Sequence, residues 1–151
     1  MKILFIGDVV GMRSCEALQR ELHNVKQKLG AEVIIVNGEN SAEGNGINPA
    51  SAGAIFDAGA DVITTGNHCF RQKTMEAEWE HNERIIRPAN FDDEVIGRGI
   101  CVLDRGAYSI AVINLMGTTY MQPLENPFRC ADRLLESCDA RIKIAVSYTH
   151  L

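Results

Sequence analysis

The sequence predicts an α/β fold in which parallel strands alternate with helices. Three short apolar runs rich in branched residues, at 2–6, 32–37 and 61–65, are typical of strands buried on both faces of a sheet. Segments with the apolar spacing of helices separate these runs. Strands and helices that alternate in this way form right-handed βαβ units, in which neighbouring strands are parallel.

The first three helices are predicted from their end signals and their apolar spacing. Ser14 is predicted to cap the first helix, and Gly30 is predicted to end it. An Asn-Pro pair is a good start signal for a second helix over roughly 49–58. A third helix is predicted over about 72–80, with a methionine and a tryptophan on one face.

The second part of the chain has a different pattern. Residues 99–104 and 107–115 flank an Arg-Gly pair and are predicted to form an antiparallel hairpin. A further helix is predicted to begin near Pro127, and residues 142–146 are predicted to form one more strand. The length of 151 residues fits a single domain with enough material for a hydrophobic core.

Composition narrows the range of functions. The formal net charge of −5 argues against a surface that coats nucleic acid, although it is compatible with a small phosphorylated substrate held by metal ions. The five cysteines include no CxxC pair, which predicts reduced thiols and a cytoplasmic protein. The first apolar run is too short for a secretory signal or a membrane span. A homo-oligomer is compatible with the sequence.

Polar residues follow each of the three predicted parallel strands, and a glycine precedes each group. These residues are Asp8, Glu39, Asn40, Asn67 and His68. Because ligands bind beyond the carboxyl ends of strands in open α/β sheets, we expect these side chains to share one edge. Each group alone is more typical of a turn or a helix cap. Together, their oxygen and nitrogen donors favour a site for manganese, iron or magnesium.

The strand ends and their surroundings resemble the calcineurin-like metallophosphoesterases, whose motifs occur here in the order GD, GEN and GNH. They resemble the YmdB-type subgroup more closely, through ILFIGDVVG, VNGENSAEGNGI, GADVITTGNH, IRPANF and AVINLMG. The resemblance extends over nearly the whole chain. It implies an α/β sandwich of two sheets flanked by helices, of which this chain would hold the N-terminal half to two-thirds.

The same resemblance implies a role for each polar residue. Asp8 would bind the first of two metal ions, iron or manganese or else magnesium, and Glu39 would bridge both. Asn40 and Asn67 would be further ligands. His68 would donate a proton to the leaving oxygen, because imidazole titrates near neutral pH, while a metal-bound hydroxide attacks the phosphorus.

The chain departs from the superfamily pattern at three positions. Val10 replaces the histidine of the usual first motif, and Glu39 stands where a bridging aspartate is usual. Cys69 occupies a position that often carries an acid, and we expect it to pack in the core. The first departure is shared with the YmdB-type subgroup.

The C-terminal part of the family supplies further histidine ligands, including a His-x-His pair. Counted without gaps from Ala131, His150 falls at one such family position, although its neighbours do not match. We therefore expect a single metallophosphoesterase domain over 1–151 that is incomplete at its C-terminus.

The resemblance implies hydrolysis of cyclic nucleotides or related small phosphoesters by a metal-dependent phosphodiesterase. Two alternatives stay open at this point. The chain could be a metal-binding regulatory or interaction protein, or an inactive fragment that lacks the C-terminal histidine ligands. The presence of His68, which need not be a ligand, favours the enzyme.

Overall fold

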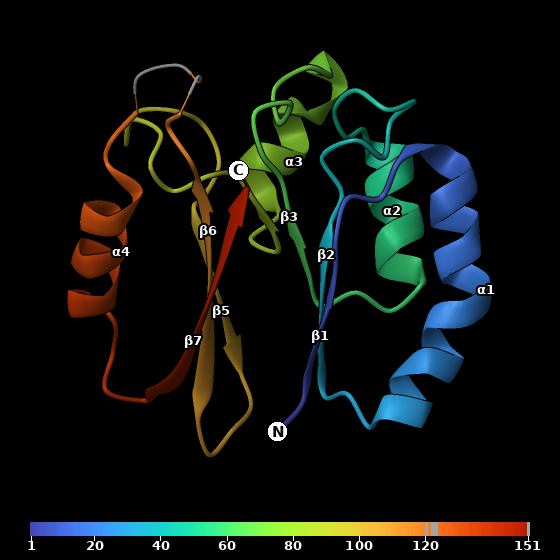
Figure 1. Cartoon of the computed structure of the whole chain (residues 1–151), viewed down its shortest axis with the longest axis horizontal. Helices are drawn as coiled ribbons and strands as arrows, with labels where there is room; N and C mark the ends of the chain where they lie inside the picture. The colour runs from blue at the N-terminus through green and yellow to red at the C-terminus, as the bar shows by residue number, and fades with distance from the viewer. Residues whose placement is uncertain (120, 122–123, 151) are drawn as a thin grey trace.

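Two β-sheets form the centre of the molecule, with helices on their outer sides (Figure 1). The arrangement comes from a computed structural model, which describes residues 1–119, 121 and 124–150. Within its last strand, the described side chains are those of Ile142 and Ala145. The predicted α/β sandwich of two sheets flanked by helices is confirmed for this part of the chain.

The first sheet is parallel and carries the three strand ends described above. Its strands lie in the order β1 (Ile3–Ile6), β2 (Val33–Asn37), β3 (Val62–Thr64) and β4 (Ile85–Ile86). The connecting helices are α1 (Gly11–Leu29) and α2 (Pro49–Asp57), followed by the 3-10 turn η1 (Lys73–Met75) and α3 (Glu76–His81). The predicted alternation of strands and helices is therefore confirmed.

The second sheet has the order β5 (Ile100–Asp104), β6 (Ser109–Met116) and β7 (Ile142–His150). The β5–β6 pair is the predicted antiparallel hairpin, and β7 pairs with β6 in parallel. Helix α4 (Pro127–Glu136) begins where the sequence predicts and is capped by the Asn126 side chain, which accepts from the amides of Phe128 and Arg129. The C-terminal end of β7 points to the same end of the molecule as the ends of β1, β2 and β3 (Figure 1).

The strand β2 lies between two hydrophobic cores. Ile34 and Val36 pack in the core that the first sheet shares with its helices. Val33 and Ile35 pack in a second core, together with residues of β5 and β6 such as Val112. Side chains alternate between the two faces of a strand, so an uninterrupted apolar run is what burial on both faces requires.

The structure differs from the sequence predictions at several local features. β1 is half-buried along its length, whereas burial on both faces was expected, because it is the edge strand of its sheet. α1 begins at Gly11, and the Ser14 hydroxyl donates to the Val10 carbonyl instead of capping the helix. The two-residue strand β4 was not predicted, and β7 extends beyond its predicted end.

The segment after β4 joins the two sheets. The Arg87 amide donates to the Arg98 carbonyl at 2.8 Å, and the Ala89 amide donates to the Asn114 carbonyl in β6 at 2.7 Å. Gly99 lies against Ala89 at this junction of the two sheets, which we call the crossing. The contact is so close that a Cβ atom on Gly99 would overlap the Cα and Cβ of Ala89. The close approach of the two backbones therefore requires glycine here.

We predict that Gly99→Ala lowers the free energy of unfolding by about 1–3 kcal/mol, because the added methyl overpacks the crossing. Gly53→Ala is the matched control: it lies within α2, and its Cβ would meet nothing within 4 Å. That control is expected to raise stability by about 0.5–1 kcal/mol. Urea denaturation monitored by circular dichroism measures both, and equal midpoints for the two variants would contradict the crossing as described.

Candidate active site

Hydrogen bonds connect the ends of the three parallel strands. Asp8 follows β1, Asn40 follows β2 and His68 follows β3. The Asn40 amide nitrogen Nδ2 lies 2.7 Å from Asp8 Oδ1, and the Asn40 oxygen Oδ1 lies 2.7 Å from His68 Nδ1. The structure thus brings three of the sequence-predicted site residues together at one edge of the sheet.

The direction of these hydrogen bonds follows from the chemistry of the groups. An ionised carboxylate only accepts hydrogen bonds, so Asp8 must receive one from the Asn40 NH₂ group. The amide oxygen of Asn40 is then left for His68, whose Nδ1 must donate. In the neutral imidazole, this arrangement puts the proton on Nδ1 and leaves Nε2 as the basic nitrogen.

The backbone fixes the positions of Asp8 and Asn40. The Val9 amide donates to the Asn37 carbonyl at 2.9 Å, and the Gly11 amide donates to the Asn40 carbonyl at 3.0 Å. Directly before Val9, Asp8 has a φ of 29°, in the region that residues other than glycine rarely adopt. Such conformations cost about 1–3 kcal/mol and concentrate at functional sites, where surrounding contacts hold them.

Glu39 lies deeper than Asp8 and is 1% exposed. Burial raises the pKa of the neighbouring Cys69 thiol to about 12, and the charge of Glu39 also acts to raise it. Cys69 is therefore a neutral, buried thiol, in agreement with the packing role predicted for it. The donors at this edge are carboxylate and amide oxygens with one imidazole, a set that fits a hard or borderline divalent ion.

Asn37 was not singled out from the sequence. It is the last residue of β2 and is fully buried, and its Oδ1 accepts a 3.4 Å hydrogen bond from the Glu39 amide. Its Nδ2 has no hydrogen-bond partner within the described residues. An asparagine at the end of an otherwise apolar buried strand is the sequence signal that could have indicated it.

Within the described residues, Asn67 is not part of this hydrogen-bonded group. Asn67 is half-buried and faces a cleft of about 680 Å³ beside the strand ends, which Phe70, Arg71 and Phe91 also line. His150 is the last residue of β7, where its backbone pairs with Met116, but its side chain lies outside the described part of the chain. Among the described residues, no group of three or more His, Cys, Asp or Glu side chains is arranged so that it could hold a metal ion.

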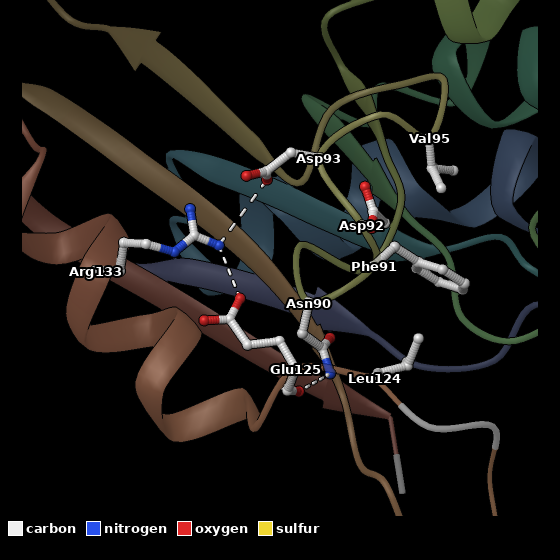
Figure 2. Close-up of a pocket in the computed structure, with 8 residues that line it drawn as sticks. All are labelled: Asn90, Phe91, Asp92, Asp93, Val95, Leu124, Glu125 and Arg133. Atoms are coloured by element: carbon white, nitrogen blue, oxygen red, sulfur yellow. Dashed lines mark hydrogen bonds and ion pairs between the residues drawn. The ribbon is translucent and has the colours of Figure 1, made fainter.

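A second hollow of about 430 Å³ lies between the segment after β4 and α4 (Figure 2). Its cation, Arg133, is hydrogen-bonded to Glu125 at 2.8 Å and lies 4.0 Å from Asp93. The hydrogen bond from Arg133 lowers the pKa of Glu125, so the pair stays charged and joined near neutral pH. This hollow therefore offers no unpaired cation for an anionic substrate among its described residues.

The family of the chain follows from comparison with known proteins. A model of the YmdB-like protein family matches residues 4–150, and the chain belongs to this family. The chain is similar, at 37% identity over 93% of its length, to the 2',3'-cyclic-nucleotide 2'-phosphodiesterase of Bacillus subtilis. It is 31% identical to a putative phosphatase/phosphodiesterase of Mycoplasma pneumoniae over 94% of its length. The chain spans 53% of each of these relatives.

Solved structures agree with this assignment. A hypothetical protein from Thermus thermophilus matches the whole chain with a TM-score of 0.89 at 32% identity, and the match covers 59% of that protein. A novel phosphatase from Mycoplasma pneumoniae matches with a TM-score of 0.87 at 29% identity, over 56% of its own chain. The resemblance to the YmdB-type metallophosphoesterases, and the fold that it implies, are confirmed.

Two further properties bear on the predicted location. Among the described residues, no helix combines the length and the apolar character needed to cross a membrane. All five cysteines are unpaired thiols, and four of them are buried. The cytoplasmic location inferred from the cysteine pattern stays a prediction.

We predict that neutral His68 carries its proton on Nδ1, because the Asn40 oxygen accepts from that nitrogen. Long-range ¹H–¹⁵N correlation spectra, recorded at a pH where imidazole is neutral, distinguish the two tautomers. Asn40→Ala should move the equilibrium toward the Nε2–H form that free imidazole side chains favour. His81, which is exposed on α3, is the internal control and should be unaffected by the substitution. An Nε2–H tautomer in the unsubstituted chain would contradict the hydrogen-bond assignment.

Proposed function

We propose that this chain carries the N-terminal part of a metal-dependent phosphoesterase site, acting as a phosphodiesterase on cyclic nucleotides or related small phosphoesters. The observation that carries the proposal is the Asp8–Asn40–His68 hydrogen-bonded group at the ends of three parallel strands. The names of the relatives from Bacillus subtilis and Mycoplasma pneumoniae support the reaction class and, for the first, the substrate class.

In this proposal, two divalent ions are held by oxygen donors that follow all three strands, with Asn67 as the donor after β3. Asp8 would hold the first ion, buried Glu39 would be the ligand shared by the pair, and Asn40 and Asn67 would contribute amide oxygens. His150, at the end of β7, is a further ligand, which the common direction of β7 and the first sheet supports (Figure 1). The oxygen-rich set fits iron, manganese or magnesium, and the resemblance to the family favours iron or manganese.

When bound, such a metal pair polarises the phosphoryl oxygens and lowers the pKa of a coordinated water. The residues of this chain supply binding and proton transfer around it. A carbonyl oxygen has two lone pairs, so Asn40 Oδ1 can face a cation while it still accepts from His68 Nδ1. Neutral amide ligands leave more positive charge on the site than carboxylates would, which favours a negatively charged phosphoester.

His68 is proposed as the proton donor to the leaving oxygen. Its ring is held by Asn40 through Nδ1, so its Nε2 is the nitrogen that can carry a proton to the departing alkoxide. Asn40 is held in turn by Asp8, so the orientation of the imidazole depends on the end of β1, two strands away. General acid catalysis of this kind typically contributes about 10²–10⁴-fold to the rate.

Hydrolysis of a 2′,3′-cyclic nucleotide, whose leaving group is an alkoxide, with added manganese tests the proposal, with metal content measured in the same samples. His68→Ala is expected to lower turnover by about 10²–10⁴-fold and to retain the metal. Glu39→Gln is expected to lose both turnover and metal. His81→Ala, at an exposed position of α3, is the matched control and should behave as the unsubstituted chain.

The alternatives predict different outcomes in this assay. Metal binding without turnover would favour a regulatory metal-binding protein, and it would contradict the proposed enzyme if the Bacillus subtilis relative were also inactive. An active relative beside an inactive chain would show that turnover needs the part of the relatives that this chain does not match. Loss of metal from His68→Ala would make His68 a ligand and remove it as the proton donor.

A further inference from the structure

The cleft that Asn67 faces is lined by both polar and aromatic side chains. Asn67 and Arg71 are its polar lining residues, and Phe70, Phe91, Val95, Met116 and Met121 line the rest. Its volume of about 680 Å³ falls within the range of about 300–1,000 Å³ that is typical of small-molecule sites. Apolar and aromatic side chains combined with a few polar groups are the usual composition of such a site.

Tight turns place three of these residues on the same side of the chain directly after the strand end. The Cys69 amide donates to the Gly66 carbonyl at 3.2 Å, and the Arg71 amide donates to the His68 carbonyl at 3.1 Å. Both turns lie within the segment whose residues Asn67, Phe70 and Arg71 line the cleft. The cleft is therefore built from the same turn that presents His68.

The aromatic rings of the cleft are held by packing. The Phe70 ring lies edge-on to the Trp79 ring, at a centroid distance of 5.5 Å, and edge-on to the Phe91 ring at 5.9 Å. Phe70 is 39% exposed, so part of its ring faces solvent. Rings that are already fixed lose little conformational freedom when a flat ligand stacks on them.

Buried polar side chains fix the segment that carries Phe91. The Arg87 guanidinium is buried and donates to the carbonyl groups of Pro88, Asp92, Val95 and Ile96. The Asn90 amide donates to the carbonyls of Met116 and Glu125 and accepts from the Met116 amide. Figure 2 shows the Phe91 ring pointing away from Arg133, and the ring lines the cleft described here.

Arg71 supplies an available positive charge to the lining of the cleft. Its side chain is exposed, and within the described residues its guanidinium takes part in no hydrogen bond or ion pair. This differs from Arg87 and Arg133, whose guanidinium groups are both occupied. A guanidinium of this kind recognises phosphate oxygens well, since its donors match their geometry.

We propose that this cleft is a base-binding subsite, in which the nucleobase of a nucleotide stacks on the face of Phe91 and meets the Phe70 ring at a steep angle, while Arg71 contacts the phosphate. The orientation of the phosphate toward Asn67 is the part of this inference that rests on the proposed phosphoesterase function. The stacking part rests on the cleft alone. Aromatic side chains recognise any nucleobase through its π-face, so the subsite selects nucleotides over other phosphoesters without strong preference among bases.

The test uses methionine-methyl NMR of the chain with magnesium present, because two of its five methionines line the cleft. Adenosine 2′-monophosphate is expected to shift the signals of Met116 and Met121 and to leave those of Met1, Met12 and Met75 in place. Ribose 5-phosphate should bind about tenfold more weakly, since it lacks the base. Equal affinity for the two probes would overturn the proposal.

Two variants separate stacking from phosphate contact. Phe91→Leu should weaken adenosine and its monophosphate about tenfold but leave ribose 5-phosphate unchanged, whereas Phe128→Leu, at an exposed position on α4, should alter none of them. Arg71→Gln, at an exposed position, should weaken adenosine 2′-monophosphate but not adenosine. Unchanged affinities in both Phe91→Leu and Arg71→Gln would overturn the subsite.

Free adenosine, titrated without metal, separates the two proposals. Shifts of Met116 and Met121 by adenosine support the subsite even if metal-dependent turnover is never observed, an outcome that would remove the phosphoesterase proposal alone. Turnover that depends on His68, combined with no adenosine-induced shift of these two signals, would overturn the subsite and leave the phosphoesterase proposal standing.

Discussion

The pair of hydrogen bonds made by Asn40 is the interaction on which the candidate site depends. An amide both donates and accepts, so one side chain can join a carboxylate on one neighbouring strand end to an imidazole on the other. A carboxylate at this position could not donate to Asp8, and an amine could not accept from His68. The chemistry of this one residue therefore sets the orientation of the groups on both sides.

This arrangement requires the three strands to end at the same level, which the core provides. Ile6 of β1 is paired with Val36 of β2, and Val36 is paired with Ile63 of β3. Slippage of one strand by one residue would exchange its core-facing side chains for those of the opposite face. Burial of β2 on both faces therefore maintains the register that aligns Asp8, Asn40 and His68. The proposed metal site rests on that alignment.

Much of this architecture could be predicted from the residues themselves. Continuous apolar runs predicted β2 and β3, and an Asn-Pro pair predicted the start of α2, because these signals are local. The edge position of β1, the two-residue β4 and the start of α1 were missed, because each depends on which segments become neighbours in space. Alternation along the chain predicts a parallel sheet but not which strand lies at its edge.

The same distinction applies to the site. The polar residues after each strand identified Asp8, Asn40 and His68, but the hydrogen bonds among them depend on side-chain directions that a sequence does not specify. The cleft was missed altogether, since Phe70 and Phe91 belong to different segments and meet only in the fold. Asn37 was overlooked because its burial at the end of β2 depends on the second sheet.

The most direct measurement of the central claim is anomalous diffraction from crystals of the chain grown with manganese. The proposed site predicts anomalous peaks within coordination distance of Asp8 and Glu39, with Asn40 or Asn67 as an additional ligand. Manganese bound elsewhere, with no peak near Asp8 or Glu39, would contradict the assignment of these strand ends as a metal site.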